Sequence, residues 1–338
     1  MSFQALEPDD FVVSVDSITS GIWTDETASL FTFFTSSTQA ASSAGNYYLN
    51  VYDTATTESI QFAVTYGNET GLGTELYDPA VSGYSYSGTI WGQYQILVLG
   101  DENANFSWGG ITGSDFWALS FERNRYKEAL FPGSLTLTLK NSTDYLTLTD
   151  NSQIVASQTF TDAGRVFQLV SGSAGVVYSG SGTDGINGYS PSSGSYGWLL
   201  PDIGTILLNP LAISQSINLV PTRTANTDGQ NPAQLFTAIS GSGAASFPFT
   251  LNSQENISSD FIFVRPRSSQ FNYSQNPSFI SGSTGEVLYN SFINNPQVYI
   301  TTVGLYNDAS ELLAVAKLSR PLLKDFTKEA LIRVKLDF

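Results

Sequence analysis

The chain has 338 residues, is 41% apolar, and carries a formal net charge of −16, so it is long enough to bury a sizeable core and has the composition of a folded protein. It contains no cysteine and no histidine, which excludes disulfides, thiolate nucleophiles, Ser-His-Asp and Cys-His catalytic sites and the commonest metal ligands, although no motif marks the Ser-Lys pair that this composition still allows. No stretch of about 18 apolar residues marks a membrane helix, and we expect no membrane insertion.

Charge is distributed unevenly along the sequence. Residues 1–122 hold 15 acidic side chains and no Lys or Arg, whereas 317–338 hold six basic ones. The simplest interpretation is that acidic surface keeps the protein soluble. The alternative is that an acidic face of one subunit steers onto a basic edge of the next. An acidic chain whose basic residues are scattered lacks a patch for contacting phosphates and is not expected to bind nucleic acid.

Alternation of apolar and polar residues predicts an all-β fold of mostly antiparallel, sandwich-like domains with few short helices. Residues 60–66 have this period, and 134–140 and 146–149 form a hairpin around Asn141–Asp144. A closing strand is expected at 332–338 in preference to a short helix at 328–332. Further strands are expected at 11–16, 47–52, 94–99, 116–122, 165–170, 203–208, 260–265, 298–306 and 311–318.

Two helices are expected. One covers 232–240, with Asn231 as its N-cap and Gly241 as its stop, and the other covers 124–130 before Pro132-Gly133. Composition divides the chain into a β-domain at 1–155 and a Gly- and Ser-rich middle region at 156–245, with an inserted domain as the alternative for the middle region. A C-terminal β-domain follows at 246–338, and alternatively this segment completes the first sheet.

No catalytic motif is present, and we expect neither enzymatic activity nor a cofactor. The remaining enzymatic option is a carboxylate pair such as Asp9-Asp10 or Asp101-Glu102, as in a polysaccharide depolymerase. Clustered carboxylates also suit calcium, although no calcium-loop motif occurs.

Aromatic residues cluster in the first third of the chain, where they suggest two alternatives. Exposed rings stack on sugars, as in a receptor-binding module of a tail fibre, whereas buried rings fill the β-core, and we favour the core. The candidate ligand-facing residues are Tyr84, Tyr86, Trp91 and Trp108.

Several phrases of the sequence are similar to those of a known family. They are 3–13, 33–37, 125–127 with 131–134, 162–166, 302–308 and 311–321. Together they resemble virion structural proteins of T-even-like myoviruses that infect marine cyanobacteria, and the likeness is weakest at 171–235. The end of the chain is also similar to the end of some baseplate wedge proteins.

The resemblance implies a structural subunit of a contractile tail, in the baseplate or its periphery. Its partners would be other tail or baseplate proteins, in multiple copies per virion, and its location the virion after synthesis in the host cytoplasm, since the acidic N-terminus does not read as a signal peptide. The segment 311–338 is the expected contact region, unless it simply closes its own sheet. The interface candidates are Leu312, Leu313, Val315, Lys317, Arg320, Arg333, Lys335 and Phe338.

Overall fold

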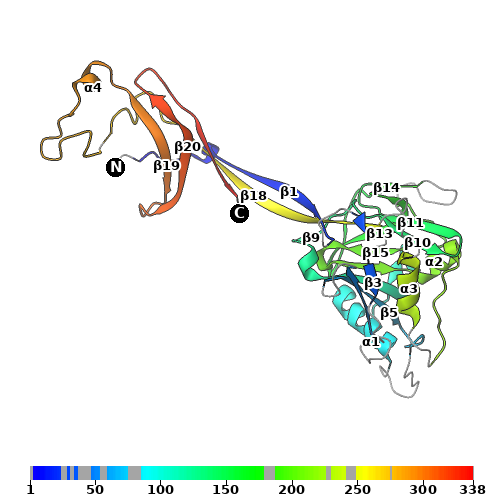
Figure 1. Ribbon diagram of the computed structural model, residues 1–338. Coiled ribbons are helices and arrows are strands. Elements are labelled where there is room, and N and C mark those ends of the chain that lie inside the picture. Colours follow the sequence, from blue (N-terminus) through cyan, green and yellow to red (C-terminus); the bar gives the residue numbers. More distant parts are fainter. Residues whose placement is uncertain are drawn as a thin grey trace. The chain divides into compact units, whose positions relative to one another are not determined.

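The computed structural model describes residues 3–23, 29–30, 34–36, 47–53, 59–74, 85–178, 187–225, 230–240, 249–274 and 276–337. The chain folds into two compact units. Unit 1 combines Met1–Ser17 with Asn256–Phe338, and unit 2 comprises Ile18–Glu255. The fold is all-β and mostly antiparallel with a few short helices, as the sequence predicts (Figure 1).

Unit 2 contains most of the regular structure. Its strands are β2 (Ser29–Leu30), β3 (Phe34–Ser36), β4 (Leu49–Asp53), β5 (Ile60–Asn68), β6 (Ser107–Trp108), β7 (Ile111–Thr112), β8 (Asp115–Phe121), β9 (Ala129–Leu130), β10 (Leu137–Asn141), β11 (Asp144–Asp150), β12 (Thr159–Thr161), β13 (Gly164–Ser173), β14 (Val176–Val177), β15 (Gly197–Leu200), β16 (Thr205–Leu208) and β17 (Phe249–Thr250). Its helical elements are α1 (Tyr86–Tyr94), the π-helix η3 (Gln95–Leu99), the 3-10 turns η4 (Arg123–Arg125) and η5 (Pro201–Ile203), α2 (Pro210–Ile217) and α3 (Gln230–Ser240).

Unit 1 is built from fewer and longer strands. It contains the turn η1 (Pro8–Asp10), the strand pair β19 (Val298–Tyr306) and β20 (Leu312–Lys324), the closing strand β21 (Ile332–Asp337) and the short helix α4 (Asn290–Asn294). Two strands, β1 (Phe11–Gly21) and β18 (Asn252–Val264), begin in one unit and end in the other.

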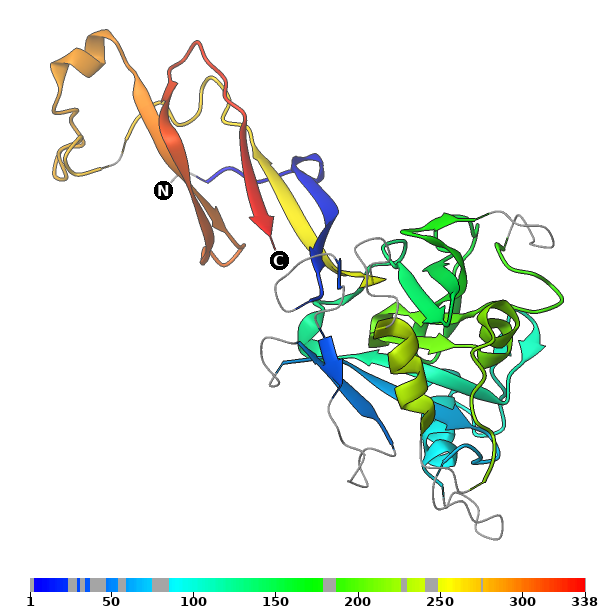
Figure 2. The same ribbon diagram turned by 45° about the vertical axis from the view of Figure 1, so that its right-hand side comes forward.

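The core of unit 2 lies on both faces of one large sheet. Its main path runs β10-β11-β13-β15-β16-β8-β5-β4-β3. In β8, Trp117 and Leu119 enter a core shared with α2 and α3, whereas Phe116 and Ala118 enter a second core shared with α1. A strand buried on both faces needs apolar residues at successive positions, which β8 supplies. Figure 2 shows α3 beside this sheet.

The sheet explains why the domain division predicted at 155 does not match the compact units. Strands β10 and β11 precede that position, and β13, β15 and β16 continue the same sheet after it. The middle region is therefore an integral part of unit 2. The chain leaves this unit after Glu255, where β18 continues into unit 1.

Two predicted elements are wrong. Residues 94–99 are helical and not a strand: Ser85 Oγ accepts the N–H of Gly88 at 3.1 Å to begin α1, and Gly100, with φ of 70°, ends η3. The expected helix at 124–130 is replaced by η4 and β9, because β9 pairs with β18 at Leu130↔Ser253.

Asn231 does not cap α3. The helix begins at Gln230, and the buried Asn231 amide donates to the carbonyls of Gly73 and Thr222 while accepting the N–H of Thr222. Its own carbonyl accepts the indole N–H of Trp117 at 3.0 Å. The Asn231 side chain thus holds the helix to the loops at Gly73 and Thr222, and its backbone carbonyl holds it to β8.

Asp150, at the end of β11, is a buried carboxylate without an ion pair among the described residues. It accepts the N–H of Gly133 at 2.8 Å and that of Ser152 at 3.1 Å. Burial raises the pKa of Asp150 above its ordinary value of 3.8, although these hydrogen bonds act in the opposite direction.

The raised pKa of Asp150 gives stability a defined pH dependence. A carboxyl whose pKa is higher in the folded than in the unfolded chain stabilises the fold when it is protonated. This contribution is complete at pH values below the pKa of the unfolded chain, near 3.8, and is lost as the pH rises through the pKa of the folded chain. We therefore expect the free energy of unfolding of the wild type to increase relative to that of Asp150→Asn as the pH falls from 7 to about 4. Urea unfolding of both proteins measures this difference, and a difference independent of pH would contradict it.

Candidate assembly surface

Unit 1 buries few of its apolar side chains fully, and the others are half-buried or exposed. Among its described residues, Ile262 and Val334 are the buried apolar side chains, whereas unit 2 buries a large core. The exposed large apolar side chains of unit 1 are Phe3, Phe11, Val12, Val13, Val15, Tyr273, Leu288, Tyr289, Ile293, Tyr299, Tyr306, Leu312, Leu313, Val315, Phe326 and Leu331. Large exposed apolar areas commonly mark interaction sites, so these side chains are the candidate interaction surface of unit 1.

The β19–β20 pair shows the imbalance most clearly. Its register places Val303 opposite Ala316 and Leu305 opposite Ala314, and all four side chains are half-buried on one face. On the other face Leu313 is 68% and Val315 is 59% exposed. Gly304 lies opposite Val315 and adds no side chain to cover it. A two-stranded sheet is marginally stable alone, so contacts from further structure would stabilise it.

The interface residues predicted from the sequence lie on two sheets. Leu312, Leu313, Val315, Lys317 and Arg320 are on β20. Arg333 and Lys335 are on β21, which pairs with β18, and all seven are exposed. Phe338 lies outside the described residues. The structure thus makes these side chains accessible without gathering them into one sheet.

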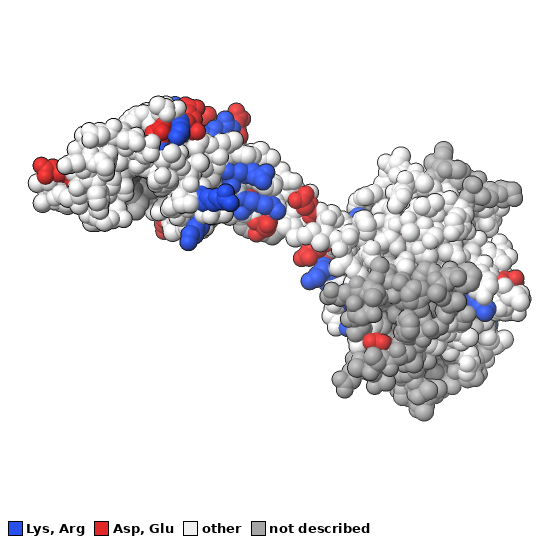
Figure 3. Space-filling view, turned by 45° about the horizontal axis from the view of Figure 1, so that its top comes forward, with Lys and Arg blue, Asp and Glu red and all other residues white. Residues whose placement is uncertain are grey.

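The basic residues of β21 lie beside an aromatic ring. Arg333 Cζ is 5.4 Å and Lys335 Nζ is 5.9 Å from the centroid of Phe261 in β18. Lys335 also forms an exposed ion pair with Asp337 at 2.9 Å, whereas the structure gives Arg333 no ion pair within the described chain. Figure 3 shows Lys and Arg side chains gathered on this unit.

Lys324, at the end of β20, is fully buried and was not predicted as important. Its Nζ donates to the Asn272 side-chain oxygen at 2.8 Å and to the carbonyls of Ser268 and Asp325 at 3.0 Å each. A buried ammonium is tolerated when its donors are satisfied in this way. Alternation along β20 places Lys324 on the face opposite the exposed Lys317, but its burial depends on Ser268 and Asn272, which are more than 50 residues away in the sequence.

The candidate sugar-stacking aromatics do not form a surface. Trp91 and Trp108 are buried and pack around Phe106, so these two rings are not available to a ligand. Tyr86 is half-buried with its ring 4.3 Å from that of Tyr47. Tyr84 lies outside the described residues. For the two tryptophans the core interpretation is the one that the structure bears out.

The carboxylate pairs lie in local, structural environments. Asp10 is buried and pairs with Arg265 at 3.0 Å, whereas its neighbour Asp9 is exposed. Asp101 is exposed and accepts the N–H of Asn103 at 2.8 Å. The described part of the chain contains no group of three or more acidic side chains that could hold a metal ion.

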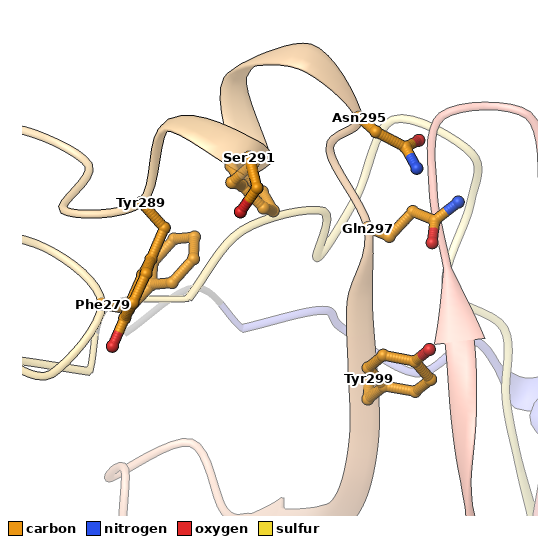
Figure 4. A pocket seen from close by; sticks show the side chains of 7 residues that line it. Phe279, Tyr289, Ser291, Asn295, Gln297 and Tyr299 are labelled. Carbon is orange, nitrogen blue, oxygen red and sulfur yellow. The ribbon is translucent and has the colours of Figure 1, made fainter.

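A shallow, open pocket of about 410 Å³ lies in unit 1 between α4 and the start of β19. Tyr289 and Phe279 lie beside one another on one side, and Tyr299 projects from the strand (Figure 4). Asn295 and Gln297 supply amide groups, and the remaining lining residues are Ser291 and Phe292. Aromatic rings with adjacent amides are groups that can contact a saccharide.

Comparison with protein-family models, with curated proteins and with solved structures finds no match for this chain. Among the described helices, none combines the length and apolar character needed to cross a membrane.

Proposed function

We propose that this chain is a non-enzymatic structural subunit of a contractile phage tail, in the baseplate or its periphery. The observation that carries the proposal is the apolar strand surface of unit 1, above all Leu313 and Val315 on β20. Burying such side chains against a neighbouring subunit contributes roughly 1.5–3 kcal/mol for each one fully covered. The resemblance of the sequence phrases to tail proteins supplies the kind of assembly.

A charge placed on this surface should block assembly without unfolding the chain. We expect Val315→Asp to reduce incorporation into particles of the encoding virus at least tenfold, because a carboxylate buried in an apolar interface has no partner. The matched control is Val176→Asp, since Val176 is also an exposed strand residue, at 62%, but belongs to unit 2. Quantitative immunoblotting of purified particles measures incorporation, and equal incorporation of both variants would overturn the proposal.

The pocket at α4 supports a second candidate function, recognition of a host saccharide. Tyr289 and Tyr299 are more than half exposed, so their rings are accessible. If this function holds, a glycan array probed with the whole protein will show a ligand whose binding Tyr299→Ala weakens at least tenfold. Tyr178→Ala, at an exposed tyrosine of unit 2, should leave binding unchanged, and an array without any bound glycan would refute this candidate.

A further inference from the structure

The two outer strands of the sheet β1-β18-β21 have free edges. Within the described residues, β18 is the strand neighbour of both β1 and β21, and neither has a second one. Each outer strand therefore presents a row of backbone N–H and C=O groups to solvent. Such a row is a template for pairing with another strand.

The charges along these two edges are opposite. The segment leading into and along β1 carries the exposed acids Glu7, Asp9 and Asp16, and no basic residue occurs before position 123. The other edge carries the exposed Arg333 and Lys335 and one exposed acid, Asp337, which pairs with Lys335 at 2.9 Å. The net charge of β21 is therefore positive, and Arg333 has no ion pair within the described chain. Complementary edges of this kind favour contact between different edges over contact between like edges.

Exposed apolar side chains accompany the acidic edge. Phe11, Val13 and Val15 project from one face of β1 and Val12 from the other, and all four are exposed. An added strand would cover part of each of these side chains. A long, exposed and partly apolar edge strand that stays unpaired promotes aggregation, whereas pairing with a specific partner strand covers it.

The direction of the strands fixes the geometry of such pairing. Asp10 contacts Arg265 and Ser20 contacts Ser253, so β1 runs antiparallel to β18. Strand β21 is also antiparallel to β18. Strands β1 and β21 consequently run in the same direction, and a second copy in the same orientation would continue the sheet through a parallel pair.

We propose that β21 of one copy pairs with β1 of the next copy of this chain, so that the sheet continues head to tail around a closed ring. This inference rests on the proposed assembly function and names its partner as a second copy. Contacts between two different edges are heterologous, and they form a ring when the rotation between copies closes.

Engineered cysteines test this arrangement directly, because the natural chain has none. Val13→Cys and Val15→Cys place a thiol on β1, and Ile332→Cys and Leu336→Cys place one on β21. Neighbouring strands lie about 4.8 Å apart, within the range that a disulfide spans. We expect mild oxidation to join a β1 variant to a β21 variant, and a chain with both thiols to form a ladder that ends at the ring size. Val176→Cys is the control for random collision.

Two results would overturn the inference: disulfides between two β1 variants, which indicate like-edge contact, or no cross-link above the control in any combination.

Charge reversal provides a second measurement. Asp16→Lys or Arg333→Glu alone should weaken self-association about tenfold, and mixing the two variants should restore it. Full-length chains that remain monomeric but still enter particles would refute the ring and leave the proposed function standing. Loss of incorporation in Val315→Asp, with normal incorporation of Asp16→Lys and Arg333→Glu, would likewise refute the ring and leave the proposed function standing.

Discussion

Lys324→Met is expected to open unit 1 around residues 265–274, at a cost of roughly 2–5 kcal/mol in local stability. The substitution removes the three hydrogen bonds of Nζ and leaves the Asn272 side-chain oxygen and the carbonyls of Ser268 and Asp325 without this donor. Each buried acceptor left unsatisfied costs about 1–3 kcal/mol. Unit 1 has little apolar core to offset the loss.

Hydrogen exchange followed by mass spectrometry measures this effect at 265–274, where we expect protection to fall by at least tenfold. Lys328→Met is the matched control, because it removes the same charge from an exposed position paired with Asp325 at 3.3 Å. Protection at 265–274 that is unchanged in Lys324→Met would show that the buried ammonium does not organise this segment.

Trp117→Ala is expected to destabilise unit 2 by about 3–5 kcal/mol, the range found when a large buried aromatic side chain is removed. Trp117 is fully buried in β8, lies 6.2 Å from the ring of Tyr66 and donates its indole N–H to Asn231. Trp117→Phe keeps much of the ring volume and loses that donor, so a smaller cost of about 1–2 kcal/mol in addition to any repacking is expected.

Urea unfolding followed by circular dichroism gives both values. Tyr145→Ala, at an exposed position of β11, should change the free energy of unfolding by no more than about 0.5 kcal/mol. A cost for Trp117→Ala as small as that of Tyr145→Ala would contradict the assignment of Trp117 to the centre of the core.

The sequence predicted the strands where alternation was strong. The hairpin around Asn141–Asp144 and the strands at 298–306 and 332–337 are found in the structure. Alternation failed at 94–99, where a run of apolar residues is compatible with either a strand or a buried helix. There the helix is set by Ser85 and Gly100, which lie outside the run itself.

The candidate surface was predictable only in part. The predicted interface residues between Leu312 and Lys335 are exposed, as residues that contact another subunit must be in the free chain. A sequence pattern, however, does not reveal whether an apolar strand face is covered by its own chain. Burial of Trp91 and Trp108 depends on α1 packing against the face of the sheet that carries Phe116 of β8 and on contacts with Trp198 of β15, which are distant in the sequence. The roles of Lys324 and Asn231 likewise depend on partners distant in sequence.

The central claim is that the apolar strands of unit 1 are covered by other subunits when the protein works. Hydrogen exchange of residues 312–324, compared between the free chain and chain incorporated into purified particles, tests this claim most directly. We expect exchange in this segment to slow at least a hundredfold in the particle, while the unit 2 strand β14 changes little. Equal exchange of 312–324 in both states would contradict the account.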